Sequence, residues 1–344
     1  MNRLITVCLL PLSWVFGFAV IVRNLFYDAG ILPATRIRTP VISVGNLTTG
    51  GTGKTPFTEY LVRHFLKAGK SVAVLSRGYR RASKGTLIVS DGKTLTADPA
   101  AAGDEPFQIA SKFPGIVVVV DESRARAAKL VEERFRTDMV ILDDGFQHRK
   151  LERSADIVMV DGDSRLRAMP LLPAGRRREP MSSLRRADFL VFTGNPPGNP
   201  EEFSGARLPY AVAHRRLSGF RRIGGPESPE RPELLRGKRV LAVCGIAVPA
   251  GFRETLEGAG AVVAGLIAYP DHHRYTAPDV EDILRRTETP GVEALVTTEK
   301  DAVRLLPFAG RLRTAPVTVF AAMIELSIVE GEHRLDALLR DTVS

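Results

Sequence analysis

Short apolar segments alternate with longer amphipathic ones along most of the chain. Runs rich in Val and Ile occur between residues 40 and 194, in the order PVISVGN, SVAVLS, GTLIVSDG, GIVVVVDE, DMVILDDG, DIVMVDG and DFLVFTG. Each is followed by a polar or glycine-containing stretch. Such runs are typical of buried parallel strands joined by crossover helices. The pattern therefore predicts an α/β/α sandwich.

A second series of apolar runs starts near residue 238, with RVLAVCG, AVVAGLIAYPDHH and EALVTTEKDA, and it predicts a smaller α/β domain. Between the two series, YAVAHRRLSGFRRIGGPESPERPE first alternates and then becomes rich in Pro, Gly and Glu, which is typical of a strand and a linker. APVTVFAAMIEL predicts a returning strand, and GEHRLDALLRDTV a closing helix. We expect an anchor helix at 1–25, a first domain at 26–208, a linker strand and loop at 209–235, a second domain at 236–314, and the return strand and helix at 315–344.

The N-terminal residues form a long apolar segment that suits a membrane better than water. Leu4–Val22 is a run of 19 residues without a charge, and a helix of this length is about 28 Å long, close to the thickness of a bilayer core. Arg23, Arg36 and Arg38 follow it, so the positive-inside rule predicts that the body of the protein lies in the cytoplasm. A cleaved signal peptide is one alternative. Another is a helix that is kinked at Pro11 or lies in the membrane interface.

A phosphate-binding loop is indicated by GNLTTGGTGKTPFTE, residues 45–59, directly after an apolar run. The pattern G-x-x-x-x-G-K-[ST] requires Gly at position 48, where this chain has Thr48, but Gly53, Lys54 and Thr55 fit it. Glycines let the backbone N–H groups approach an anion, Lys54 is expected to reach the β- and γ-phosphates, and Thr55 to bind Mg²⁺. The residues expected to contact the nucleotide are Thr48, Thr49, Gly50, Gly51, Thr52, Gly53, Lys54 and Thr55. A glycine-rich turn with a chance lysine is the alternative.

The residues after this loop predict a helix. Phe57, Leu61 and Phe65 follow helical spacing, Pro56 suits a first turn, and Gly69 suits a helix end. The N-terminus of such a helix points its N–H groups and its dipole at the bound phosphates.

Carboxylates follow two other segments. Met139–Leu142 runs into Asp143 and Asp144, as expected of a Walker B strand that holds Mg²⁺, although two carboxylates at a strand end can also cap a following helix. Because side chains alternate along a strand, the two should differ in role. Asp104 and Glu105 precede the predicted helix FQIASKF, where capping is again an alternative.

The sequence PDHHRY, residues 270–275, follows an apolar run of the second series. No third ligand with suitable spacing is visible, so a zinc site is not favoured. A histidine beside a carboxylate can instead tune a catalytic base, and a plain surface loop is the alternative.

Charge points to an anionic partner. The 344 residues carry a formal net charge of +9, and the hydrophobic fraction of 44% excludes wholesale disorder. Arginines cluster in RGYRR, ESRAR, GRRREP and LRR. Few aromatics interleave with them and no nucleic-acid module is recognisable, so an anionic lipid surface or headgroup is favoured over nucleic acid. The only two cysteines, Cys8 and Cys244, have no metal-ligand spacing and fit a reducing compartment.

Three classes of phosphate-loop protein compete. A GTPase would carry an Asn-Lys-x-Asp motif, which TTEKDA does not match. A partitioning ATPase would carry a lysine where this chain has Thr49. A small-molecule kinase needs an acceptor site and a base, and so has a use for a second domain that closes over the first.

The motifs VGNLTTGGTGKTP, SRGYRR, GDEP, LDDGFQHRKL, LPAGRRREP, CGIA and PDHHRY occur in this order behind an apolar N-terminal helix. Together they resemble the tetraacyldisaccharide 4'-kinase family of lipid A biosynthesis, over essentially the whole chain. The resemblance implies transfer of the ATP γ-phosphate to the 4'-hydroxyl of a tetraacylated glucosamine disaccharide 1-phosphate, with Mg²⁺, at the cytoplasmic face of the bacterial inner membrane. It also implies a P-loop NTPase-like sandwich and a smaller α/β domain joined by two strands, without an obligatory protein partner.

The resemblance further implies roles for single residues. Asp104 matches the proposed base, assisted by a histidine of the Asp-His segment, for which His272 is preferred over His273. Lys54 is expected to act in catalysis as well as in nucleotide binding. The expected metal ligands are Thr55, Asp143, Asp144 and Glu105. The expected acceptor-binding or anion-binding residues are Tyr79, Arg124, Gln147, His148 and Arg178. The alternative function is a membrane-associated P-loop ATPase that couples hydrolysis to assembly.

Overall fold

The computed structural model of the chain describes residues 3–162, 166–196, 200, 203, 208–225 and 229–343. It divides into two compact units, residues 1–214 with 326–344, and residues 215–325. Residues 1 and 2 of the expected anchor and residues 226–228 of the expected linker lie outside the described part.

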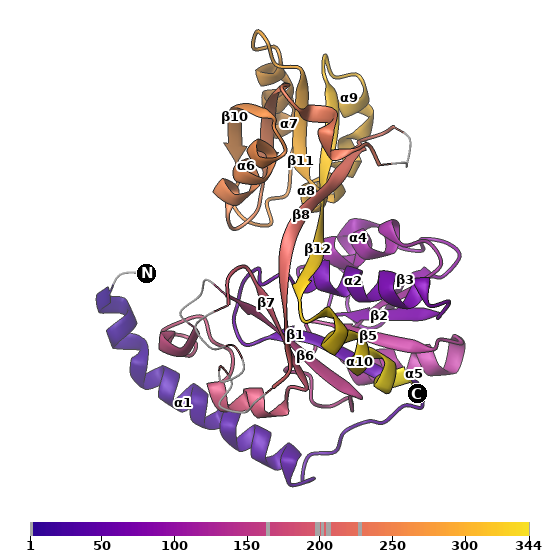
Figure 1. Ribbon diagram of the computed structural model, residues 1–344, viewed down its shortest axis with the longest axis vertical. Coiled ribbons are helices and arrows are strands. Elements are labelled where there is room, and N and C mark those ends of the chain that lie inside the picture. Colours follow the sequence, from indigo (N-terminus) through magenta and orange to yellow (C-terminus); the bar gives the residue numbers. More distant parts are fainter. Residues whose placement is uncertain are drawn as a thin grey trace. The chain divides into compact units, whose positions relative to one another are not determined.

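Unit 1 contains a mostly parallel sheet of eight strands (Figure 1). Its strands are β1 (Val41–Asn46), β2 (Val72–Ser76), β3 (Leu87–Asp91), β4 (Val117–Val120), β5 (Met139–Asp143), β6 (Ala155–Asp161), β7 (Phe189–Thr193) and the start of β8 (Tyr210–Arg222). They are hydrogen-bonded in the order β8-β7-β6-β1-β5-β2-β4-β3. The paired strands of the described part are parallel except β3 with β4, which are antiparallel.

The antiparallel edge corrects the expectation of an all-parallel first series. The chain from β2 to β3 (77–86) contains no described helix, so β3 is not reached by a helical crossover. A parallel neighbour requires a long crossover, whereas an edge strand can return antiparallel. The α/β class itself is confirmed.

Helices cover both faces of this sheet. They are α2 (Lys54–Lys67), α3 (Pro99–Ala102), α4 (Asp104–Lys112), α5 (Arg124–Arg134) and α10 (Glu332–Val343). The side chains of Val140 and Leu142 pack in one cluster with Ala127 of α5. Asp143, next along β5, instead contacts Thr58 of α2. Since side chains alternate along a strand, α5 and α2 lie on opposite faces.

The N-terminal helix α1 (Arg3–Asp28) contains Pro11, and Ile5–Asp28 is long and apolar enough to cross a membrane. Only 17% of the most apolar stretch of this helix is buried. Trp14 and Phe18 are 71% and 69% exposed, whereas Ser13, on the other side of the helix, is 2% exposed. The helix therefore has one face fixed on unit 1 and a second, apolar face directed outward.

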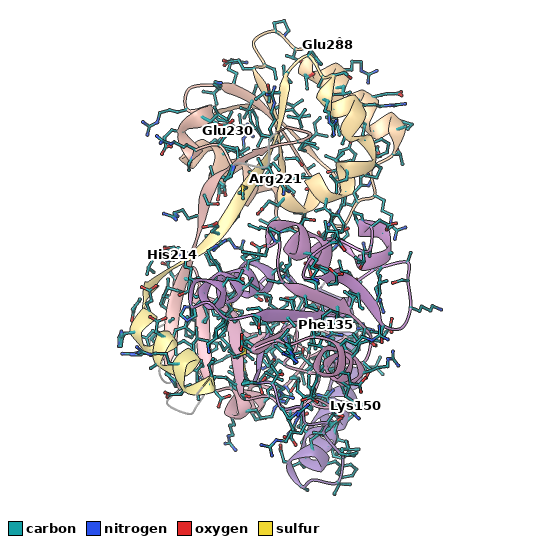
Figure 2. The ribbon with its side chains drawn as sticks, turned by 90° about the vertical axis from the view of Figure 1, so that its right-hand side faces the viewer. Phe135, Lys150, His214, Arg221, Glu230 and Glu288 are labelled. Atoms are coloured by element: carbon teal, nitrogen blue, oxygen red, sulfur yellow. The ribbon has the colours of Figure 1, made fainter. Side chains whose placement is uncertain are left out.

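Unit 2 has the strands β9 (Arg239–Cys244), β10 (Val262–Ala268), β11 (Ala294–Thr298) and β12 (Thr318–Glu330), in the order β10-β9-β11-β12 and all parallel. Its helices are α6 (Pro249–Gly258), α7 (Ala277–Thr287), α8 (Glu299–Leu305) and α9 (Ala309–Arg313). Two strands cross the unit boundary, β8 after His214 and β12 before Leu326. Figure 2 labels His214 and Arg221 along β8.

Candidate active site

The loop between β1 and α2 has the conformation expected of a phosphate-binding loop. Gly50 and Gly53 have φ angles of 120° and 87°, which a residue with a Cβ adopts only with strain. Gly53 is the residue before α2, and no side chain caps this helix. The free N–H groups at the start of α2 are therefore available to an anion.

The loop is supported from within by Asn46, a residue that the sequence analysis did not single out. Its Nδ2 donates to Thr52 Oγ1 at 2.9 Å, and its main-chain oxygen accepts from Gln147 Nε2 at 2.9 Å. Asn46 is fully buried at the end of β1. An Asn directly behind an apolar strand was the available signal, and it ties the loop to the segment after β5.

Asp143 and Asp144 occupy different environments. The strands β1 and β5 pair so that Val44 lies opposite Asp143, which places the carboxylates beside the phosphate loop. Asp143 is 2% exposed and accepts hydrogen bonds from Thr58 Oγ1 at 3.2 Å and Ser76 Oγ at 3.5 Å. The described chain between β5 and β6, residues 144–154, contains no helix, so the helix-capping alternative is wrong.

The pKa of Asp143 is raised to about 7, first by burial and then by the negative charges of Glu105 and Asp144. The positive charges of Lys54 and Arg124 lower the pKa by less. This carboxylate thus lacks enough positive charge around it. Such a deficit is what a bound cation relieves.

Asp144 lies at the entrance of the loop, with a φ angle of 54°. Its carboxylate is 3.5 Å from Lys54 Nζ and accepts from Arg178 Nη1 at 2.9 and 3.1 Å. Burial favours a raised pKa for Asp144, but the charges of Lys54 and Arg178 outweigh it and lower the pKa. Asp144 is therefore ionised and already paired.

Gln147 and His148 follow in the same turn. Gln147 Oε1 accepts from Arg178 Nη1 at 3.4 Å. Arg178 therefore connects Asp144, an expected metal ligand, with Gln147, an expected acceptor-binding residue. Burial, followed by the charge of Arg124, lowers the pKa of His148 to about 4. His148 is neutral at pH 7 and can only form hydrogen bonds there, without adding a positive charge.

Arg124 is the first residue of α5 and is 2% exposed. Its Nη1 donates to the Asp121 oxygen at 2.7 Å, and its Nε and Nη2 have no hydrogen-bond partner among the described residues. Burial lowers its pKa to about 10, while the charges of Asp143 and Asp144 raise it. Arg124 therefore remains a cation near the two aspartates, with spare donors.

Asp104 and Glu105 do not cap a helix, which corrects that alternative. The helix α4 starts at Asp104, and the residue before it is Gly103, whose φ angle is 92°. Both carboxylates therefore lie in the first turn, where the helix dipole is positive. The Glu105 charge acts on Asp143, so this turn is near the strand carboxylates.

Tyr79 lies in the loop after β2 and is 57% exposed. A Cβ at Gly103 would come within 3.3 Å of the Tyr79 oxygen and 3.1 Å of Gly78, so the Tyr79 loop packs on the start of α4. The Arg80 guanidinium carbon lies 5.4 Å from the Tyr79 ring centre. The loop that carries the exposed Tyr79 therefore lies next to the start of α4.

In unit 2, His272 is held by Arg304, a residue that the sequence analysis missed. Arg304 Nη2 lies 3.2 Å from His272 Nδ1, and Arg304 Nη1 donates to Asp301 at 2.8 Å. Because arginine only donates, Nδ1 must accept, and neutral His272 carries its proton on Nε2. The spacing of Asp301 and Arg304 on one face of α8 was the signal available in the sequence.

His273 is committed to a different contact. Its Nε2 is 3.0 Å from Asp279, which closes the capping box of α7 with Thr276, and its ring stacks on Tyr269 at 4.4 Å. No group of three or more His, Cys, Asp or Glu suited to a metal occurs in the part of the chain that the structure describes.

The arginine clusters are used differently from the expectation of a lipid-facing surface. Arg81 pairs with Glu122 at 2.6 Å, Arg126 with Asp121 at 2.6 Å, and Arg186 with Glu179 at 2.7 Å. Arg176 donates to the oxygen of Thr49 at 2.7 and 3.0 Å. Many of the clustered arginines are therefore paired with carboxylates or carbonyl oxygens of the same chain.

Comparison with known proteins agrees with this geometry. A family model described as tetraacyldisaccharide-1-P 4'-kinase (LpxK) matches residues 5–344. The tetraacyldisaccharide 4'-kinase of Anaeromyxobacter dehalogenans is 41% identical over 94% of this chain and 87% of its own length. That of Geobacter metallireducens is 40% identical over 96% of both chains.

A solved structure is similar over the full length. The crystal structure of LpxK from Aquifex aeolicus, described as an "apo" form in complex with ATP, matches with a TM-score of 0.81 and 34% identity, over 98% of this chain and 99% of that one. The chain belongs to the tetraacyldisaccharide-1-P 4'-kinase family.

Proposed function

We propose that this chain transfers the γ-phosphate of ATP to the 4'-hydroxyl of a tetraacyldisaccharide 1-phosphate, the reaction after which its family is named. One observation carries the proposal: Lys54 Nζ lies 3.5 Å from Asp144 at the mouth of a glycine loop that leads into α2. Phosphoryl transfer requires mainly positioning and charge neutralisation. Lys54 and the N–H groups at the start of α2 supply both.

The donor set suits Mg²⁺. Thr55, Asp143 and Asp144 offer only oxygen atoms, which a hard divalent cation prefers, and the raised pKa of buried Asp143 shows a local deficit of positive charge. Mg²⁺ in kinases uses one or two carboxylates together with phosphate oxygens, so three clustered protein carboxylates are not required. When bound, the cation would neutralise charge on the transferred phosphate. Asp143 is held for this by Thr58 and Ser76.

Asp104 is the proposed base. It lies in the first turn of α4, on the same helix as Glu105, whose charge reaches Asp143. Its role is to accept the proton of the sugar hydroxyl at the carboxylate oxygen as the oxygen attacks phosphorus. His272 is the proposed assistant, because its proton is on Nε2 and can be donated, whereas His273 is used by Asp279.

The acceptor is expected to contact Tyr79, Gln147, His148, Arg124 and Arg178. Arg178 joins Asp144 to Gln147, and Arg124 has two donors near the aspartates that find no partner in the described part of the chain. Neutral His148 contributes hydrogen bonds without adding a positive charge. The exposed Tyr79 ring offers a face on which a sugar can pack.

The proposed location is the cytoplasmic face of the inner membrane. Helix α1 presents exposed Trp14, Phe18 and Leu25 on its outward face, which fits insertion into a bilayer. An acceptor with four acyl chains resides in the same membrane. Attachment therefore brings enzyme and acceptor into one phase.

Labelled ATP distinguishes this function from that of a membrane ATPase. Full-length protein is incubated with [γ-³²P]ATP and Mg²⁺, with and without the disaccharide 1-phosphate in mixed micelles. A kinase transfers label to the lipid, and Lys54→Met as control does not. Release of inorganic phosphate alone, at the same rate with and without the lipid, would refute the proposal in favour of the ATPase.

A further inference from the structure

Residues 171–179, which we call the strap, lie between β6 and β7 and contact both the phosphate loop and helix α1. In Figure 1 helix α1 is indigo and the strap falls in the pink part of the colour scale. The strap contains no helix or strand, so its course is set by its contacts. These contacts form two groups, one at each of two functional parts of unit 1.

The first group fixes the phosphate loop at Thr49. The Thr49 amide donates to the oxygen of Arg176 at 2.8 Å, and the Arg176 guanidinium donates back to the oxygen of Thr49 from Nη2 at 2.7 Å and from Nε at 3.0 Å. Thr48 forms an antiparallel bridge with Arg177. At the next residue, Gly50, a Cβ would collide with Arg176 Nη2. The strap therefore constrains three consecutive loop residues, 48–50.

The contact continues to the carboxylate side of the site. The Arg178 amide donates to the oxygen of Leu47 at 2.6 Å, and its guanidinium donates to Asp144 at 2.9 Å. The strap therefore holds the loop before its glycines and after β1, and it also holds one aspartate. The loop conformation depends on the strap as well as on its own sequence.

The second group fixes helix α1. Ser13 Oγ donates to the oxygen of Leu171 at 2.9 Å and accepts from the Ala174 amide at 3.0 Å. Gly17 has no room for a Cβ, which would lie 2.6 Å from Leu171 Cδ1. At the other end of the strap, Asn24 Nδ2 donates to Glu179 at 3.1 Å.

These α1 residues define one side of the helix. Ser13, Gly17 and Asn24 follow helical spacing, and Ser13 and Asn24 are 2% and 9% exposed. Glu179 is fully buried and also pairs with Arg186 at 2.7 Å. The side of α1 opposite the exposed apolar face is therefore bonded to the same nine residues that hold the phosphate loop.

We propose that the strap couples the seating of α1 on unit 1 to the shape of the phosphate loop, and that Arg176 is the positioning residue at the loop end. The inference rests on the proposed role of that loop in binding ATP. A membrane helix seated through Ser13 and Asn24 holds the strap, and Arg176 holds the oxygen of Thr49 so that the glycines open toward the phosphates. Arg176 acts through the Thr49 backbone, without contacting the reacting atoms.

Affinity and hydrogen exchange test the coupling. Full-length wild type, Arg176→Met, Arg176→Lys and Ser13→Ala are purified in one detergent, and ATP binding is measured by calorimetry without the acceptor. The control Arg185→Met removes the same charge from an exposed position beyond the strap. Amide exchange of residues 47–53 is measured without nucleotide, which gives a readout independent of turnover.

Arg176→Met should weaken ATP binding by about three- to tenfold and speed exchange at residues 48–51, because two hydrogen bonds are lost. Arg176→Lys should lie between it and wild type, since one donor can be restored. Ser13→Ala should shift both readouts in the same direction by a smaller factor. Arg185→Met should match wild type.

A double mutant decides whether the two ends communicate. If the strap transmits the seating of α1, Ser13→Ala should have little further effect in the Arg176→Met background. Equal effects in both backgrounds, or unchanged exchange at residues 48–51 in Arg176→Met, would overturn the coupling. If Lys54→Met binds ATP as wild type does, the phosphate-loop assignment itself is refuted. If Lys54→Met loses ATP binding but Arg176→Met binds ATP as wild type does, only the proposed role of the strap is refuted.

Discussion

Replacing Asp143 by asparagine should stabilise the ligand-free protein while abolishing phosphotransfer. The side chain is 2% exposed, and burial with nearby Glu105 and Asp144 raises its pKa to about 7. Asparagine has the same shape and keeps an oxygen for Thr58 Oγ1. It also places an amide where Ser76 Oγ can accept. The substitution therefore removes the charge and keeps the packing.

The magnitude follows from linkage. The folded pKa of about 7 lies above the ordinary value of 3.8, so the folded protein binds this proton more tightly than the unfolded chain. The stabilising contribution of this proton to the folded state is complete below pH 3.8 and decreases as the pH rises. Above pH 7 it is lost completely, and the loss in free energy of unfolding is about 4 kcal/mol. If Asp143→Asn recovers about half or more of it, the Tm above pH 7 rises by about 5–15 °C. At pH 5 the gain should be smaller by about 3 kcal/mol.

Thermal unfolding of the two proteins with EDTA and without nucleotide, at pH 5 and pH 8.5, provides the measurement. Asp144→Asn is the matched control, because Lys54 and Arg178 lower the pKa of Asp144. That substitution removes two ion pairs and should lower the Tm at pH 8.5. A gain for Asp143→Asn that does not change with pH, or shifts of the same sign for both variants, would refute the assignment of opposite environments.

Lys54→Met should weaken ATP binding and cut turnover by at least about 10²-fold, measured by calorimetry and by label transfer, since the positive charge beside Asp144 is lost. Asp104→Asn should lower kcat by about 10²–10⁴-fold while the Kd for ATP stays near wild type; an unchanged kcat removes Asp104 from the chemistry. Arg304→Met should release His272 Nδ1, detectable as a mixture of imidazole tautomers by ¹⁵N NMR, and lower kcat without altering ATP affinity. Deleting residues 1–28 should abolish sedimentation with membranes at high salt, and retained sedimentation would assign attachment to the basic surface instead.

The fold was largely predictable because its signals are local. Runs such as MVILD and VVVV are typical of strands buried on both faces of a sheet covered by helices, and both are fully buried interior strands here. The orientation of β3 was not predictable in this way. Residues 87–91 read like any other strand, and their direction depends on the connection and on which edge was free.

The site was predictable where one motif contains its own partners. Gly53, Lys54 and Thr55 are fixed by a strand and a helix that flank them, so their conformation follows from the sequence. Asp143 and Asp144 were expected to differ, because neighbours along a strand face opposite ways. Their actual partners come from 67 to 85 residues away for Asp143, and no spacing rule connects them.

The arginines show most clearly what charge alone does not reveal. In the sequence each cluster is a similar run of cations, and the net charge of +9 favours an anionic surface. In the fold, Arg126 is paired with a fully buried carboxylate, Arg176 is bonded to a loop carbonyl, and Arg124 is enclosed beside two aspartates. A guanidinium that donates to a carbonyl or carboxylate of its own chain has fewer donors left for a lipid phosphate. Membrane attachment is therefore better assigned to the outward apolar face of α1 than to the arginine count, because burial of that face does not depend on charge.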